Sequence, residues 1–176
     1  MINSKISVIM AVYNSEKFLS ESIESILNQT FRDFEFVIID DCSTDKSLGI
    51  IQKYSKKDDR IVVIENEKNL GCAKSRNKAL KVAKGKYIAR IDDDDRVSPH
   101  RLYKQVQYLN NNEGIHLVTS DFEYFGDMNE KRIAFEKEMA HAWSLFTCPF
   151  DHPTIMFRKQ FFVENNLFYD ESRKYV

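Results

Sequence analysis

Apolar and polar positions follow a repeated strand–helix pattern along the first two thirds of the chain. Four apolar runs rich in β-branched residues predict buried strands at residues 5–12, 34–40, 61–64 and 86–91. After the first run, apolar side chains recur at helical spacing at Phe18, Leu19, Ile23, Ile26 and Leu27. Strands that alternate with amphipathic helices favour a parallel sheet covered on both faces. The predicted fold class is therefore α/β, a Rossmann-like, mainly parallel central sheet flanked by helices.

Capping residues and helix breakers set the expected ends of the helices. Ser43 is a natural N-cap for the second helix, and Gly85 is a candidate C-terminal cap for a helix over residues 73–83. Pro99 fits the first turn of a further helix, which Gly114 ends. Beyond this point the pattern predicts a strand at 117–125, a short helix at 138–146, a strand at 154–157 and a helix at 158–165.

Composition narrows the class of protein. A chain of 176 residues with 43% hydrophobic residues can bury one sizeable core, so a single domain over residues 1–176 is expected. The net charge of −1 gives no overall field that would attract nucleic acid. Cys42, Cys72 and Cys148 are widely spaced and form no CxxC pair, which argues against disulfides and zinc and favours a reducing cytoplasm. The apolar stretch at residues 6–12 is too short to span a bilayer.

Polar residues cluster where three of the predicted strands end. Residues 11–14 follow the first strand, Asp40 and Asp41 the second, and the run Asp92-Asp93-Asp94-Asp95 the fourth. In an open α/β sheet, ligands bind outside the carboxyl ends of the strands, where helix N-termini and loop amides gather. All three clusters are therefore expected to face one cleft.

The run of four aspartates is the strongest chemical signal. Adjacent carboxylates repel one another, and a hard divalent cation would relieve that repulsion. Mg²⁺ and Mn²⁺ prefer oxygen ligands and usually take one or two carboxylates together with substrate phosphates and water. The alternative is a solvated acidic loop, because negative charge also stabilises the N-terminus of a following helix.

Three further residues have both a functional and a structural interpretation. The Asp41 carboxylate could accept a hydrogen bond from a nucleobase N–H, or it could cap a helix together with Ser43. Tyr13 could stack on a base, or it could pack in the core. Arg76 could bind base or phosphates with its planar fork, or it could form a surface ion pair.

Five segments taken together resemble a known family. SVIMAVYN, VIIDDCSTD, NLGCAKSRNKAL, GKYIARIDDDD and DHPTIMFRK are similar to the successive signatures of glycosyltransferase family 2, whose bacterial members are inverting enzymes with the GT-A fold. The resemblance runs from about Ile6 to Arg158. Five signatures in the right order, at strand and helix ends, make a chance match an unsatisfactory explanation.

The resemblance implies roles for the strand-end residues. It implies a UDP-sugar donor, with Ala11 and Tyr13 lining the base pocket, Asp41 bonded to the uracil ring and Arg76 holding the nucleotide. Asp92 or Asp93 would lie near the ribose, and Asp94 would bind Mn²⁺ or Mg²⁺, with a register uncertain by one residue. His152 would line the acceptor side, although a structural role in fixing its loop is equally compatible with the sequence.

The resemblance also implies a reaction. An acceptor hydroxyl would attack the anomeric carbon while a carboxylate takes its proton, and UDP would leave from the opposite face with inversion of configuration. The metal would neutralise charge on the departing diphosphate.

The position of the catalytic base is the one departure from the family pattern. The family places an acidic base shortly after a segment like residues 168–175, and this sequence stops at Val176. We therefore expect a nucleotide-binding part at residues 1–114, an incomplete acceptor-side part at 115–176 and a base beyond Val176. A donor-binding or assembly module without turnover is the alternative. A nucleotidyltransferase fits less well, because residues 13–15 lack the Gly-rich phosphate loop.

Partners follow from the family rather than from single residues. The resemblance implies a UDP-sugar donor, a glycan, lipid-linked or protein-linked acceptor, and work in cell-surface glycan or glycoprotein synthesis. It also implies a cytoplasmic protein that can rest on the inner face of the membrane. The sugar, the acceptor and the oligomeric state are left open by the sequence.

Overall fold

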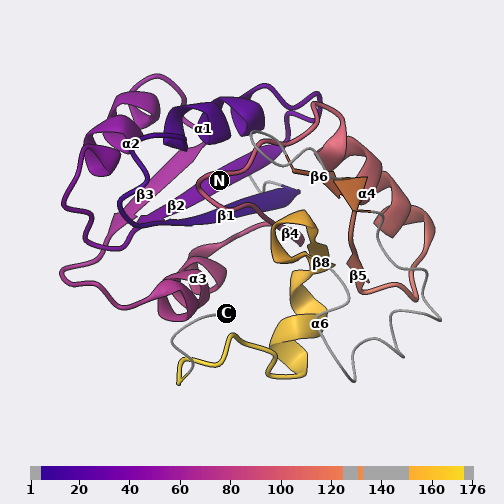
Figure 1. The fold of residues 1–176 in the computed structure, drawn as a ribbon. Coiled ribbons are helices and arrows are strands. Elements are labelled where there is room, and N and C mark those ends of the chain that lie inside the picture. The colour runs from indigo at the N-terminus through magenta and orange to yellow at the C-terminus, as the bar shows by residue number, and fades with distance from the viewer. Residues whose placement is uncertain (1–4, 125–130, 133–150, 173–176) are drawn as a thin grey trace.

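A six-stranded sheet flanked by helices forms the body of the protein (Figure 1). The computed structural model describes residues 5–124, 131–132 and 151–172. In chain order the elements are β1 (Ile6–Val12), α1 (Leu19–Leu27), β2 (Phe34–Asp40), α2 (Ser47–Ser55), β3 (Ile61–Glu65), α3 (Cys72–Val82), β4 (Tyr87–Arg90), α4 (Arg101–Asn111), β5 (Leu117–Val118), β6 (Phe122–Glu123), β7 (Lys131–Arg132), the 3₁₀ turn η1 (His152–Thr154), β8 (Met156–Arg158) and α6 (Lys159–Glu164). The helix expected at 138–146 lies outside the described residues.

The strand order confirms the predicted sheet. The order is β3-β2-β1-β4-β8-β5, and the pairs β3–β2, β2–β1 and β1–β4 are parallel. Ile6 of β1 lies opposite Phe34 of β2 on one side and Tyr87 of β4 on the other. The strand β8 runs antiparallel to both β4 and β5. Each parallel pair needs a crossover helix, which is what the alternating sequence pattern supplies.

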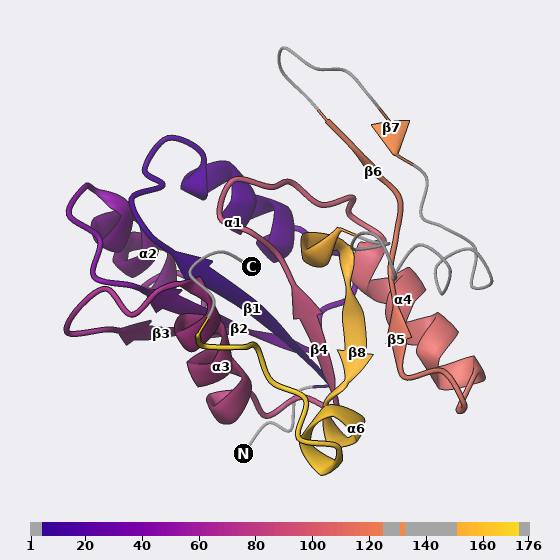
Figure 2. The same ribbon diagram turned by 60° about the horizontal axis from the view of Figure 1, so that its bottom comes forward.

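Helices cover the two faces of the sheet (Figure 2). Alternate β1 residues such as Val8 and Met10 pack on the face covered by α1, α2 and α4, where Ile23 and Leu102 are fully buried. Ile9 packs on the other face, in a smaller cluster with side chains of α3 and α6. This alternation follows from the two-residue period of a strand. The buried sheet leaves the carboxyl ends of β1, β2 and β4 at one edge.

Three expected helix ends are wrong by a few residues. The helix α2 starts at Ser47 with Lys46 at its N-cap, and the Ser43 hydroxyl instead accepts a hydrogen bond from the Asn14 amide at 3.1 Å. The helix α4 starts at Arg101, after Pro99, and ends at Asn111, before Gly114.

Gly85 has a packing role in place of the capping role expected for it. The helix α3 ends at Val82 with Ala83 at its C-cap, two residues before this glycine. A Cβ atom at Gly85 would lie 2.4 Å from the Ser7 amide nitrogen. Its amide donates to the Ser7 hydroxyl at 2.7 Å, so the position needs glycine for close approach of two backbones.

The strand expected over residues 117–125 is interrupted. Residues of β5 pair with β8 in the main sheet, whereas β6 pairs with β7 in a separate two-stranded sheet. Residue 125 itself lies outside the described residues.

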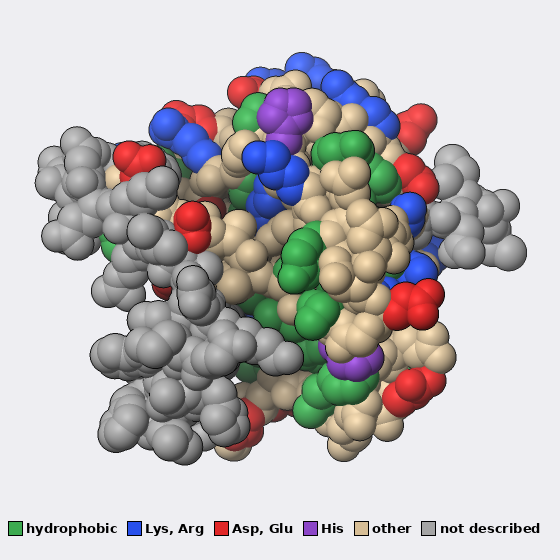
Figure 3. All heavy atoms as spheres, turned by 90° about the vertical axis from the view of Figure 1, so that its right-hand side faces the viewer, with side chains coloured by type: hydrophobic (Ala, Val, Ile, Leu, Met, Phe, Trp, Pro, Cys, Tyr) green, Lys and Arg blue, Asp and Glu red, His purple; other side chains and the backbone are tan. Residues whose placement is uncertain are grey.

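The face of the molecule on the α4 side displays interspersed acidic and basic side chains (Figure 3). Among the described residues, every helix is too short or too polar to cross a bilayer.

Candidate functional site

The carboxyl ends of β1, β2 and β4 bring the three polar clusters together, as the sequence predicts. Because these strands are neighbours in the order β2-β1-β4, the loops that follow them lie side by side. Hydrogen bonds connect all three loops, and they define the site residue by residue.

The loops after β1 and β2 are tied to each other. The Asn14 side-chain oxygen accepts from the Thr44 amide at 2.8 Å, and the Ser15 amide donates to the Ser47 hydroxyl at 2.9 Å. Asn14 and Cys42 adopt positive φ values of 54° and 63°, which for residues other than glycine is strained. The network holds the two loops in a sharply turned conformation.

Asp93 links the aspartate run to the loop after β1. Its carboxylate accepts from the Tyr13 amide at 3.3 Å and from the Ser15 hydroxyl, and its carbonyl accepts from the Ser22 hydroxyl at 2.9 Å. Burial raises the pKa of Asp93, and the Ser15 hydrogen bond opposes that effect. The Tyr13 side chain is 48% exposed, so the core-packing alternative for Tyr13 is wrong.

Asp41 fixes the connection that leads into α3. Its carboxylate accepts three hydrogen bonds, from the Asn66 side chain at 2.7 Å, the Leu70 amide at 2.9 Å and the Gly71 amide at 2.8 Å. Gly71 has a φ of 87°, a conformation that glycine adopts without strain. Asp41 does not cap α2 together with Ser43, because α2 begins at Ser47 with Lys46 at its N-cap and no side-chain cap, and the Asp41 carboxylate bonds to the segment before α3.

Arg76 and Arg90 converge on Asp92. An Arg76 Nη2 donates to Asp92 Oδ1 at 2.8 Å, and Arg90 Nη2 donates to Asp92 Oδ1 at 2.9 Å and Oδ2 at 3.1 Å. Arg76 forms the ion pair with an aspartate that was considered for it, but its side chain is 6% exposed, so the pair is not a surface pair. Arg90 was not predicted from sequence. The sequence feature that could have pointed to Arg90 is an arginine at the end of an apolar strand, two residues before an aspartate. In the structure that four-residue strand is fully buried.

The remaining aspartates are differently placed. Asp94 is exposed, and among the described residues no hydrogen bond engages its carboxylate. Burial and the negative charges of Asp92 and Asp94 raise the pKa of Asp95 to about 6. Within the described part of the chain, no group of three or more His, Cys, Asp or Glu side chains is arranged to hold a metal alone. The site fits a cation that takes one or two carboxylates and completes its shell with ligand oxygens, as Mg²⁺ and Mn²⁺ do.

His152 and Ala11 complete the predicted set. Ala11 is half-buried on β1, beside the loop that contains Tyr13. His152 begins η1, and burial together with the positive charges of Arg90 and Arg76 lowers its pKa. His152 therefore lies close enough to Arg90, Arg76 and Asp92 for their charges to act on it.

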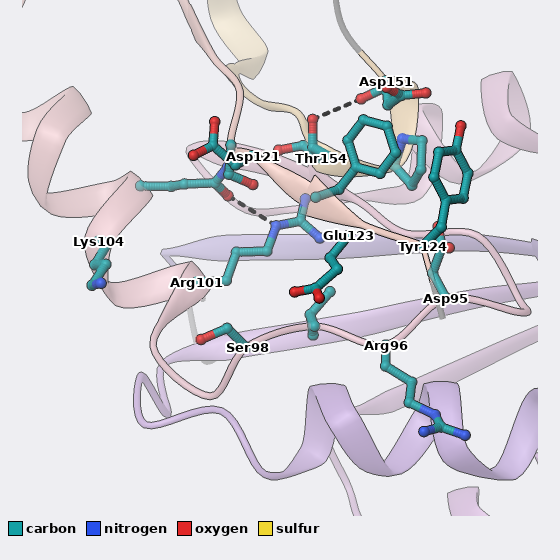
Figure 4. Close-up of a pocket in the computed structure, with 15 residues that line it drawn as sticks. Asp95, Arg96, Ser98, Arg101, Lys104, Asp121, Glu123, Tyr124, Asp151 and Thr154 are labelled. Carbon is teal, nitrogen blue, oxygen red and sulfur yellow. Dashed lines mark hydrogen bonds between the residues drawn. The ribbon is translucent and has the colours of Figure 1, made fainter. Parts of the chain in front are cut away.

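A cavity of about 690 Å³ opens beside Asp95 (Figure 4). Its walls come from the loop before α4, the first turns of α4, the β6 segment and η1. Asp95, Arg101, Glu123 and Thr154 line it from four separate segments. Acidic and basic side chains therefore surround a cavity next to the aspartate run. Their hydrogen-bonding groups suit a ligand with many hydroxyls.

Comparison with known proteins identifies relatives of this chain. The model of the family described as Glycosyl transferase family 2 matches residues 7–167. The chain is 52% identical over 126 residues to an uncharacterised glycosyltransferase of Methanocaldococcus jannaschii, covering 70% of this chain and 43% of the relative. It is 42% identical over 112 residues to the poly(ribitol-phosphate) beta-glucosyltransferase of Bacillus spizizenii, covering 62% of this chain and 18% of that protein.

Solved structures share the fold. TarS of S. aureus, in complex with UDP, superposes with a TM-score of 0.80 at 28% identity, covering 97% of this chain and 51% of the TarS chain. TarS has also been solved with UDP-GlcNAc. The chain thus spans about half or less of the length of these relatives. The mainly parallel sheet and these neighbours confirm the expected GT-A fold. The chain belongs to glycosyl transferase family 2.

Proposed function

We propose that the protein transfers a sugar from a UDP-sugar to an acceptor hydroxyl, with inversion and with the help of Mn²⁺ or Mg²⁺. The observation that supports this most is the meeting of Tyr13, Asp41 and the aspartate run at the carboxyl ends of three adjacent strands. Nucleotides bind at this edge of open α/β sheets. TarS, a structural neighbour, has been solved with UDP and with UDP-GlcNAc.

The base and ribose would bind along the loops after β1 and β2. The exposed ring of Tyr13 is available to stack on uracil, and half-buried Ala11 would form the adjacent wall. Asp41 has three donors and one remaining acceptor position, which would take the uracil N–H. Arg76, Asp92 and Asp93 would position the ribose and phosphates.

Asp94 is the residue we assign to the metal. Its carboxylate is exposed, whereas Asp92 is bonded to two guanidinium groups and Asp93 to the loop after β1. When bound, a divalent cation would neutralise negative charge on the diphosphate leaving group. The neighbouring carboxylates of Asp92 and Asp95 make the electrostatic potential at Asp94 more negative and so favour a cation there.

The acceptor would occupy the cavity beside Asp95. Asp151 and Thr154 line this cavity, and His152 lies between them on η1, where it would bound the acceptor side. The hydroxyl would attack from this side while a carboxylate takes its proton, and UDP would depart along the donor loops. We assign the base to none of the described residues. The acceptor class we propose is a glycan, lipid-linked or protein-linked hydroxyl in cell-surface synthesis on the cytoplasmic side.

Calorimetry with UDP tests the donor site. We expect UDP to bind with Mn²⁺ and to lose at least about tenfold in affinity when Mn²⁺ is chelated, because charged hydrogen bonds and metal contacts are worth more than about 1.4 kcal/mol. Asp94→Ala should reproduce the loss, whereas Asp59→Ala should not, because Asp59 is an exposed aspartate before β3, at the opposite edge of the sheet. Metal-independent binding, or equal affinities for the two variants, would contradict the proposal.

A further inference from the structure

Two buried arginines share a single carboxylate beside the aspartate run. Arg76 and Arg90 are 6% and 2% exposed, and each is bonded to Asp92. Two guanidinium groups bonded to one carboxylate carry one more positive charge than that carboxylate neutralises, and both side chains are buried. Such a charge is costly unless another anion neutralises it.

The hydrogen bonding of the pair is incomplete. Among the described residues, Nη1 of Arg76 and both Nε and Nη1 of Arg90 are buried N–H donors without an acceptor. Buried donors in native proteins are nearly always paired, and the exceptions often mark the position of a ligand or ion. The three nitrogens belong to two adjacent side chains, so they define one site with a preference for anionic oxygen.

An aromatic ring covers the pair. After α6 the chain turns back alongside α3 (Figures 1 and 2), and there the Tyr169 ring lies 5.7 Å from the guanidinium carbon of Arg76 and 6.0 Å from that of Arg90. Asn77 holds this segment, donating to the Tyr169 carbonyl at 2.9 Å and accepting from its amide at 3.0 Å. The ring offers a cation–π surface in place of an acceptor, which is a weaker partner.

We propose that Arg76 and Arg90 form a binding site for an oxygen of the terminal phosphate of a nucleoside diphosphate, closed by the Tyr169 ring until the nucleotide binds. The inference rests on the proposed function, because it places this phosphate beside the aspartates that hold the donor. Arg90 is the residue newly assigned. A guanidinium fork suits phosphate oxygens geometrically, and the unpaired donors are already in place. The Tyr169 ring must turn aside when the phosphate enters.

Arg90→Met tests the assignment by separating UDP from UMP. At a fixed Mn²⁺ concentration, we expect Arg90→Met to weaken UDP binding by about 10- to 100-fold and UMP binding by less than about threefold. The reason is that UDP has the second phosphate that the site would bind and UMP does not. The urea midpoint of this variant should equal or exceed that of the wild type, since methionine replaces a buried cation whose donors are unsatisfied.

Arg158→Met is the matched control. Arg158 is a partly buried arginine of β8 whose donors bond to the carbonyls of Leu109, Asn112 and Ile115 and to the Tyr87 hydroxyl. Its replacement should lower the urea midpoint and leave the ratio of UDP to UMP affinity unchanged. If Arg90→Met instead lowers the midpoint as this control does, or weakens UDP and UMP equally, the phosphate site is refuted while the donor site stands. Failure of the wild type to bind UDP with Mn²⁺ would refute the proposed function itself.

Discussion

Buried or partly buried arginines occur in two regions of the molecule, and their hydrogen-bond partners differ. At the junction of β4, β8 and α4, Arg101 donates to the carbonyls of Arg90 and Ile155 at 2.7 and 3.1 Å, and Arg158 donates to that of Leu109 at 2.6 Å. At the second region, the Asp92 corner formed by Arg76, Arg90 and Asp92, the two arginines share one carboxylate among the described residues. Both regions bury positive charge.

The difference separates arginines that stabilise the fold from arginines whose unpaired donors are available to a ligand. At the junction, main-chain carbonyls are the main partners of the guanidinium groups, with the Gln105 side chain and the Tyr87 hydroxyl, so the arginines join segments distant in sequence. Burial lowers the pKa of Arg101 to about 10, and Arg101 is nevertheless a cation at neutral pH. At the Asp92 corner, donors are left over in a place that faces the aspartate run. We expect mutations in the first region to affect stability and those in the second to affect binding.

Asp92→Asn should have the largest effect on stability. It removes the negative charge of the one described carboxylate that is bonded to both Arg76 and Arg90. Breaking a buried pair in this way costs about 3 kcal/mol of unfolding free energy. Urea unfolding of the variant checks this. Adding Arg90→Met to Asp92→Asn should recover part of the loss, and a loss below about 1 kcal/mol would mean that the corner is better solvated than its burial indicates.

Arg101→Met should come next, at about 2 kcal/mol. The change leaves the buried Arg90 carbonyl without its donor, because that hydrogen bond comes from Arg101 alone among the described residues. The Ile155 carbonyl keeps a second donor, the Arg90 amide, which limits the cost. Unfolding in urea gives the magnitude. A variant as stable as the wild type would remove the structural half of the comparison.

Most of the fold could be predicted from the sequence, because the spacing of apolar residues is a local signal. The strands at β1 and β2 and the helices that follow them are set by apolar spacing, and the parallel order follows from the crossovers. The start of α2 and the role of Gly85 could not be predicted, because Ser43 and Gly85 bond to Asn14 and Ser7 from other segments. Tertiary hydrogen bonds prevailed over local capping preference at both positions.

The candidate site was predictable only in part, for the same reason. Asp41 and the aspartate run follow strand ends, where position indicates function, and Arg76 lies on the helix that follows Gly71. Arg90 is the last residue of a fully buried strand, and its partner Asp92 was expected near the ribose rather than bonded to arginines. Tyr169 is distant in sequence from Arg76 and reaches it only through the return of the chain along α3. Such contacts are set by packing, and periodicity is silent about them.

Asn77→Ala tests the segment that holds the Tyr169 ring over Arg76 and Arg90. Asn77 forms two hydrogen bonds with the backbone of Tyr169 and a third with Glu171 at 2.9 Å. Their loss should cost about 1 kcal/mol and increase amide hydrogen exchange in residues 167–171 more than in β1. Because the Tyr169 cover is loosened, UDP affinity should not fall. Unchanged exchange would mean that packing alone holds the segment.

Asp58→Asn should have the smallest effect, because the pair that it breaks is partly exposed. Asp58 and Arg60 are 2.7 Å apart, with side chains 22% and 25% exposed, and the Arg60 hydrogen bond lowers the pKa of Asp58. A lowered folded pKa means that the pair stabilises the protein above the unfolded pKa of about 3.9 and loses that contribution as pH falls through the folded value. The variant should therefore lose less than about 1 kcal/mol at pH 7, and its difference from the wild type should close below about pH 4. Urea unfolding at several pH values, with Asp59→Asn as the exposed neighbouring control, checks this. A gap that widened toward low pH would contradict the assigned direction of the shift, and a gap as large as that of Arg101→Met would show that burial is not what separates the arginine environments.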